Sequence, residues 1–125
     1  MLALLLASAL VGIHTPSGNI SCAATPGGTL YCEIKRASYA HAAQERCMSR
    51  AGLDWHGFEL SPAGRGRLTC TGGILIVGRV RYQTLAYGKT WRYRGFACTS
   101  RFTGLTCTNR AGHGVFVSRE SYRLF

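Results

Sequence analysis

The sequence predicts an all-β fold: a small, single-domain, disulfide-stapled sheet, arranged as a sandwich or barrel, with short β-hairpins and at most one or two short helices. Three observations predict this class. The chain has 125 residues, which is the size of one domain. Strand-sized pieces alternate with Gly, Pro and Ser at short intervals. Six cysteines form adjacent pairs separated by hairpin-sized loops: Cys22, Cys32, Cys47, Cys70, Cys98 and Cys107.

The first twelve residues are uncharged and apolar, and they contain Ala7-Ser8-Ala9, the A-x-A form of a signal-peptide cleavage site. We therefore expect residues 1–12 to be a signal-peptide remnant or an apolar N-terminal segment, with cleavage after Ala9. Residues 13–125 would then form a single secreted β domain. The alternative is a buried N-terminal strand. No run in the chain approaches the roughly 18 apolar residues of a membrane span.

Two of the cysteine pairs flank turn signals. Residues 20–22 and 29–34 surround Pro26-Gly27-Gly28, and a tight hairpin centred on Gly27 would place Cys22 opposite Cys32. Cys98 and Cys107 flank residues 101–104, where Gly104 suits a left-handed turn position. The centre of that pair is one residue away, so we expect a bulge there.

Cys47 and Cys70 are then left to close the middle loop, although spacing alone leaves 15 arrangements open. Three disulfides indicate an oxidising compartment. The alternative is a set of buried free thiols or a zinc site. Zinc sites use closely spaced ligands, and no two cysteines here lie closer than nine positions, so the spacing favours disulfides.

The remaining elements follow from composition. Residues 37–46 are rich in helix formers and predict a short helix with Ser38 as its N-cap. Ser118 is expected to cap a last short turn through Tyr122. Predicted strands cover residues 55–60, 67–70, 74–77, 79–82, 85–87, 90–93, 96–99, 105–108 and 115–117.

The net charge of +10 is concentrated in the second half of the chain. Residues 1–64 hold four bases and four acids, whereas residues 65–125 hold eleven bases against Glu120 alone. Thirteen of the fifteen bases are arginines, which suit bidentate contact with phosphate or carboxylate. An anionic partner explains the shortage of acids. A high-GC genome and a need for solubility would explain the preference for arginine over lysine.

A basic aromatic stretch spans residues 79–94. If residues 91–94 form a strand, Trp91 and Tyr93 face one side and Arg92 and Arg94 face the other. Such an arginine comb would engage wall polymers, anionic lipid head groups or nucleic acid, with tyrosines available for stacking. The alternative is a solvated face whose aromatics lie in the core. The predicted binding residues are Arg79, Arg81, Tyr82, Lys89, Trp91, Arg92 and Arg94.

Several stretches resemble a known family. They are Thr15-Pro16-Ser17-Gly18-Asn19-Ile20-Ser21-Cys22, Leu30-Tyr31-Cys32-Glu33-Ile34, Leu53-Asp54-Trp55, Tyr87-Gly88-Lys89-Thr90-Trp91, Phe96-x-Cys98-Thr99-Ser100, Gly104-Leu105-Thr106-Cys107-x-Asn109, and Gly112 to Arg119 with Tyr122 to Phe125. The chain resembles a family of small secreted bacterial proteins, common in high-GC Gram-positives and catalogued as a domain of unknown function. The resemblance runs from about residue 15 to residue 125 and includes all six cysteines. It implies an exported, disulfide-stapled module and carries over no functional residues. One departure is the Ala-rich segment 37–44, which is usually Pro-rich in the family.

His113 is the best single candidate for an acid or a base, because Gly112 and Gly114 let the backbone turn and expose the imidazole. With Arg119 and a carboxylate such as Glu120, Glu33 or Glu59, it would suit a secreted ribonuclease. The plainer alternative is a turn histidine bonded to a backbone carbonyl. His14, His41 and His56 are far apart along the chain and form no metal or catalytic motif with it.

The leading hypothesis is a secreted, monomeric, non-catalytic module that binds an anionic envelope or extracellular polymer through its arginine-rich second half. The first alternative is the ribonuclease-like hydrolase. The second is an inhibitor or protein-binding module that uses the disulfide hairpins as rigid loops. No cofactor and no metal are indicated.

Overall fold

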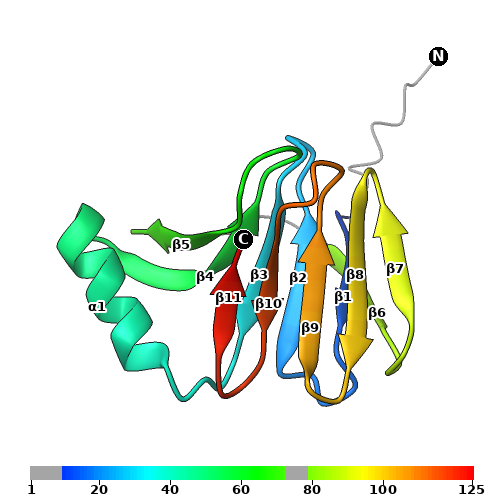
Figure 1. Cartoon of the computed structure of the whole chain (residues 1–125), viewed down its shortest axis with the longest axis horizontal. Coiled ribbons are helices and arrows are strands. Elements are labelled where there is room, and N and C mark those ends of the chain that lie inside the picture. Colours follow the sequence, from blue (N-terminus) through cyan, green and yellow to red (C-terminus); the bar gives the residue numbers. More distant parts are fainter. Residues whose placement is uncertain (1–9, 73–78) are drawn as a thin grey trace.

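The protein folds as two β-sheets packed face to face, with one helix beside them (Figure 1). The structure is a computed structural model that describes residues 10–72 and 79–125. Within these residues there are eleven strands and one helix. The predicted all-β class is therefore confirmed, in its sandwich form.

The first sheet has six strands in the order β5-β4-β3-β2-β1-β6. Strands β1 to β5 pair antiparallel with their sequence neighbours, whereas β6 pairs parallel to β1. The strands of this sheet are β1 Leu10–His14, β2 Ile20–Ala24, β3 Leu30–Ile34, β4 Asp54–Leu60, β5 Arg67–Thr71 and β6 Val80–Thr84.

The second sheet is a five-stranded antiparallel meander in the order β11-β10-β9-β8-β7. Its strands are β7 Thr90–Tyr93, β8 Phe96–Arg101, β9 Gly104–Thr108, β10 Gly114–Val117 and β11 Tyr122–Leu124. Side chains alternate along these strands, so Phe96, Cys98, Leu105 and Cys107 all point into the core between the sheets. From the first sheet, Phe58 is among the core residues that pack into the same space.

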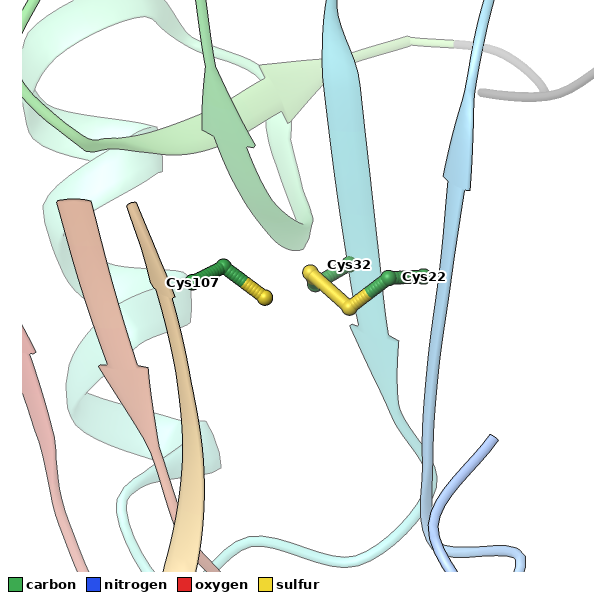
Figure 2. Close-up of side chains that lie close together, drawn as sticks. All are labelled: Cys22, Cys32 and Cys107. Carbon is green, nitrogen blue, oxygen red and sulfur yellow. A yellow bond between two sulfur atoms is a disulfide. The ribbon is translucent and has the colours of Figure 1, made fainter. Parts of the chain in front are cut away.

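The predicted disulfides are confirmed: Cys22 with Cys32, Cys98 with Cys107, and Cys47 with Cys70. The first two join residues that lie directly opposite each other, Cys22 and Cys32 on β2 and β3, and Cys98 and Cys107 on β8 and β9. Figure 2 shows Cys107 pointing at the Cys22–Cys32 disulfide from the other sheet, and the Sγ atoms of these three residues lie within 4.8 Å of one another. Each sheet therefore contributes one buried disulfide to the same part of the core.

The helix α1 covers Ala40–Ala51, and Cys47 ties it to β5. It begins and ends later than the predicted range of 37–46. The expectation that Ser38 is its N-cap was wrong, because the N-cap is Tyr39, which makes no side-chain cap hydrogen bond. The Ser38 hydroxyl instead donates to the carbonyl oxygen of Glu120 at 3.1 Å. Glu120 lies in the turn between β10 and β11 of the second sheet. A long-range partner replaces the local one.

One turn prediction needs correction. Residues 101–104 form a two-residue hairpin loop in continuous register, so the bulge expected there is absent from β8 and β9. A register shift occurs instead in β4, between Trp55 and Phe58. It contains Gly57, whose φ is 108° and whose missing Cβ would overlap the carbonyl oxygen of Cys32. The bulge thus needs glycine for both its conformation and its space.

The ends of several elements differ from prediction. Residues 85–87, predicted as a strand, form the connection from β6 to β7, and Leu85 is buried between the sheets. Strand β1 begins at Leu10, directly after the predicted cleavage position. The turn that Ser118 was expected to cap is confirmed as far as Ser121, whose backbone N–H donates to the Ser118 hydroxyl at 3.0 Å, whereas Tyr122 already belongs to β11. The predicted strand 74–77 lies outside the described residues.

Among the described residues, no helix has the length and apolar character needed to span a bilayer.

We predict that Gly57→Ala lowers the free energy of unfolding by about 2 to 4 kcal/mol, since the Cβ adds overlap to an unfavourable φ. Urea unfolding measures this change. Gly112→Ala is the matched control, because Gly112 has a φ of 82° with open space around it. It should cost only about 1 kcal/mol. Equal losses in the two variants would contradict the packing argument.

We predict that the double variant Cys47→Ala/Cys70→Ala loses about 3 kcal/mol of unfolding free energy, since the loop closed by this disulfide spans 23 residues. The two disulfides in the core, one within each sheet, remain, so amide protons of β8 and β9 should stay protected from hydrogen exchange. Loss of that protection would show that the helix tether, rather than the core, maintains the sandwich.

Candidate functional site: a basic groove at one end of the sandwich

A groove of about 740 Å³ lies at the end of the sandwich that is lowest in Figure 1. It is formed by the β1–β2 and β8–β9 turns, the segment after β3, the β6–β7 connection and the β10–β11 turn. We call it the basic groove. Its lining residues are Thr15, Ser17, Gly18, Asn19, Ile20, Lys35, Arg36, Tyr87, Arg101, Phe102, Thr103, Gly104, Ser118, Arg119 and Glu120.

The groove carries an excess of positive charge. Four cationic side chains line it, from Lys35, Arg36, Arg101 and Arg119, and Glu120 is the one acid among its lining residues. In the described part of the chain, ion pairs form only elsewhere, between His41 and Glu45 and between Glu59 and Arg67. The four cations of the groove therefore lack a protein counter-ion within the described residues, and they attract anions from solution.

Asn19 holds the two bases that follow β3. Its Oδ1 accepts a hydrogen bond from the backbone N–H of Arg36 at 2.9 Å, and its Nδ2 donates to the Arg36 carbonyl at 3.1 Å. The backbone N–H of Lys35 donates to the Asn19 carbonyl at 2.9 Å. The Asn19 side chain thus continues the hydrogen-bonding pattern of β2 and β3 beyond the ends of these strands. This fixes the backbone from which Lys35 and Arg36 project.

The β1–β2 turn is rigid for local reasons. Pro16 presets φ at the second position of the turn, and the N–H of Gly18 donates to the Thr15 carbonyl at 2.8 Å. The buried hydroxyl of Thr15 accepts from the N–H of Ile20 at 3.3 Å. This wall of the groove is therefore held by hydrogen bonds of its own.

Two residues directly before helix α1 hold the turn that carries Arg119. The hydroxyl of Tyr39 donates to the Ser118 carbonyl at 2.8 Å, and the N–H of Ser38 donates to the Arg119 carbonyl at 2.9 Å. Burial, and then the nearby Tyr122 and Glu120, raise the pKa of Tyr39, so it stays a neutral donor. Residues far apart in sequence thus set the position of one groove cation.

Two aromatic side chains stand at the edge of the groove. Phe102, at the tip of the β8–β9 hairpin, is 88% exposed, and Tyr87 is 46% exposed. Their rings meet edge to face, with centroids 5.9 Å apart. The exposed ring of Phe102 therefore lies beside the unpaired cations of the groove.

The predicted comb residues lie elsewhere, near the edges of the two sheets. Arg79, Arg81 and Tyr82 lie at β6, the edge strand of the first sheet, and Lys89 precedes β7, the edge strand of the second. Tyr82 packs near His14, with ring centroids 6.4 Å apart, and burial and then Glu33 raise its pKa. None of these four residues lines the basic groove.

Strand β7 has the predicted alternation, with one exception. Trp91 is buried in the core and stacks on Tyr93 at 5.5 Å, so it is no binding platform. Arg92 is exposed on the other face. Arg94 departs from the comb: it lies in the β7–β8 turn with a φ of 47°, and its guanidinium stacks over Tyr93 at 5.3 Å.

The residues of the predicted hydrolase set are separated. His113 directly precedes β10, whereas Arg119 and Glu120 follow it, so a strand with a rise of about 3.3 Å per residue lies between them. Glu33 is exposed on β3 and Glu59 pairs with Arg67. Among the described residues, the His113 ring has no hydrogen-bonded carboxylate. The geometry gives this set no support.

A metal site is not indicated in the described part of the chain either. The group of potential ligands that lie close together there consists of Cys22, Cys32 and Cys107, and all three sulfurs are in disulfides. Disulfide sulfur has no thiolate charge with which to hold a metal ion.

Sequence reasoning missed Lys35, Arg36, Arg101 and Phe102 as site residues. They come from two segments, 35–36 and 101–102, and only folding brings these segments together. One signal was present: Phe102 beside Arg101 in a predicted hairpin turn, where an apolar ring cannot reach the core.

We predict that Tyr39→Phe lowers the free energy of unfolding by about 1 kcal/mol through loss of the bond to Ser118. The pKa of Tyr39 is raised on folding, so its contribution is fully present below the unfolded value of about 10 and is lost as pH rises above it. Urea unfolding between about pH 8 and 11 should therefore show a steeper alkaline loss for the wild type than for the variant. Equal slopes would contradict this role.

Comparisons with known proteins give one family and no individual relative. No curated protein and no solved structure matches the chain. The model of a family of unknown function, DUF6636, matches residues 1–125. The match spans the entire chain, so the protein belongs to the DUF6636 family.

Proposed function

We propose that this protein is a non-catalytic module that binds an anionic envelope or extracellular polymer in the basic groove. The observation that supports this proposal is the set of four cations without protein counter-ions around one groove. Three of them are arginines, whose planar guanidinium groups donate paired hydrogen bonds to phosphate, sulfate or carboxylate.

Electrostatics would supply most of the affinity. A polyanion that meets four cations releases its own condensed counter-ions, so its binding weakens as salt rises. Four contacts give a slope of about −3 in log affinity against log salt, which is roughly a 50-fold loss between about 50 and 200 mM. The fixed backbone under Arg36 and Arg119 reduces the entropy lost when these groups are ordered on a ligand.

The exposed aromatic pair suits a polymer with sugar rings or bases. Phe102 and Tyr87 present ring surfaces beside the cations, and such surfaces stack on flat or apolar faces of a ligand. This adds a contact that a bare phosphate chain lacks. Heparin and wall polymers, which combine sugars with anionic groups, are therefore better probes than inorganic ions.

The groove replaces the arginine comb as the proposed site. Its cations come from both halves of the chain, Lys35 and Arg36 from the first half and Arg101 and Arg119 from the second. The three disulfides favour an oxidising, extracellular location, and we propose that the protein acts there as a monomer. No contact among the described residues favours a hydrolase.

The test is retention on immobilised heparin and on purified cell-wall material. We expect the triple variant Arg36→Gln/Arg101→Gln/Arg119→Gln to elute at clearly lower salt than the wild type. The reason is the loss of three of the four groove cations, which should reduce the salt slope of binding from about −3 to about −1.

The control variant is Arg46→Gln/Arg50→Gln/Arg65→Gln, which removes the same charge from the helix and the β4–β5 connection. It should elute close to the wild type. Equal loss in both triple variants would mean that net charge, not the groove, causes retention. Salt-tolerant capture of one protein would favour the inhibitor alternative.

A further inference from the structure

A second hollow, of about 450 Å³, lies at the opposite end of the sandwich, where β7 meets β8 and where β9 ends. Three arginines line it, from positions 92, 94 and 110, and no acidic residue is among its lining residues. We call it the arginine pocket. It shares no residue with the basic groove.

The floor of the arginine pocket follows from the sheet register. Arg92 on β7 is paired with Ala97 on β8, and Ala97 is paired with Thr108 on β9. Paired residues project on the same face of a sheet, so these three form one row. The small side chains of Ala97 and Thr108 leave a hollow beside the long side chain of Arg92.

Arg94 occupies an unusual backbone conformation. Arg94 and Gly95 are the two central residues of the β7–β8 hairpin, with φ values of 47° and 87°. Positive φ at both positions is the requirement of a type I′ turn, which favours Asn or Gly at the first. Among the described residues, Arg94 is the one non-glycine with positive φ. The strain is retained at a residue that lines the pocket.

Arg110 is held in place by a buried asparagine. Asn109 Nδ2 donates to the carbonyl oxygens of Ser61 at 3.0 Å and Gly64 at 2.9 Å. Its Oδ1 accepts from the N–H groups of Ala111 at 3.0 Å and His113 at 3.1 Å. The loop that carries Arg110 is thus tied to the first sheet's β4–β5 turn.

Gly95 makes room for the Arg110 side chain. A Cβ at Gly95 would lie 2.7 Å from Arg110 Nε, so the arginine packs directly over the turn that contains Arg94. Arg94 in turn stacks on Tyr93, which limits its directions. In the described part of the chain none of the three guanidinium groups forms an ion pair.

We propose that Arg92, Arg94 and Arg110 form a second binding site, which takes a single tetrahedral oxyanion, a phosphate or sulfate group. The three arginines line one pocket, and their guanidinium groups together carry enough N–H donors to surround one such anion. The backbones that carry them are fixed by the hydrogen bonds and turn described above. The site stands on its own observations and does not require the basic groove to bind.

Two anion sites at opposite ends make the protein bivalent. Strand β8 runs between them, and its six residues span about 20 Å at the rise of a strand. Bivalence rests on the proposed function of the basic groove: when both sites hold polyanions, we expect the protein to cross-link separate polyanion chains.

The first experiment is an NMR titration of the full chain with inorganic phosphate, then sulfate, at low salt. We expect saturable shifts of the Gly95 and Ala97 amides and of the Nε–H groups of the three arginines. Sodium chloride at equal ionic strength should not reproduce them. The variant Arg92→Gln/Arg94→Gln/Arg110→Gln should lose the shifts, whereas Arg46→Gln/Arg50→Gln/Arg65→Gln should keep them.

A single substitution separates folding from binding. Arg94→Gly relieves the positive φ, so it should raise the melting temperature while it lowers phosphate affinity at least threefold. Unchanged affinity would overturn the role of Arg94. Absence of saturable shifts in the wild type, or their persistence in the Arg92/Arg94/Arg110 variant, would overturn the site itself.

A second experiment separates free from polymer-borne anions. Light scattering with long-chain polyphosphate and with heparin should rise to a maximum at an intermediate protein ratio and fall again in excess protein. The groove variant Arg36→Gln/Arg101→Gln/Arg119→Gln should keep the phosphate shifts at Gly95 even if it fails to cross-link. That outcome distinguishes loss of the groove from loss of the arginine pocket. Phosphate shifts without any scattering by the wild type would overturn bivalence.

Discussion

The fold depends on the contact between two disulfides, one from each sheet. Cys22–Cys32 and Cys98–Cys107 each join directly opposite residues of two neighbouring strands, and the Cys107 sulfur lies within 4.8 Å of both sulfurs of the other pair. Each bond fixes the register of its own hairpin, because a slip by one residue would turn the cysteines to the opposite face. Their mutual packing then sets which faces of the two sheets meet. The chain gains a defined core from this arrangement.

Because the disulfides and the core hold the two sheets together, the turns at the two ends of the sandwich do not need apolar residues, and they carry cations instead. Asn19 and Asn109 perform the same task at opposite ends: each uses both amide atoms to fix a backbone segment that bears arginine, or lysine and arginine. Within the described residues, the side chains of both asparagines bond to backbone groups and not to an arginine side chain. They hold the backbone under the cations in place, which for the proposed anion binding means less ordering of the protein.

Local chemistry made much of this fold predictable. The hairpin of β2 and β3 follows from a Pro-Gly-Gly turn. The bounds of β7 match the prediction because Trp91 and Tyr93 alternate with polar residues, which is the period-2 pattern of a strand. Long-range effects were not predictable. Ser38 has the chemistry of a helix cap but bonds to Glu120, and Arg94 looks like a strand residue but lies in a turn. The basic groove combines turns from five places in the chain, and no sequence window contains it.

The parallel pairing of β1 with β6 has a consequence for the order in which the protein forms. Strand β1 lies inside the first sheet, yet its partner β6 is 70 residues further along the chain, at a register of Leu10 with Val80. During synthesis, one side of β1 keeps its N–H and C=O groups open until residues 80–84 have been made. Through that interval it resembles an edge strand that another extended chain is able to join. The second sheet is built from successive hairpins and has no such interval, so a chaperone that covers unpaired strand edges would act on the first sheet.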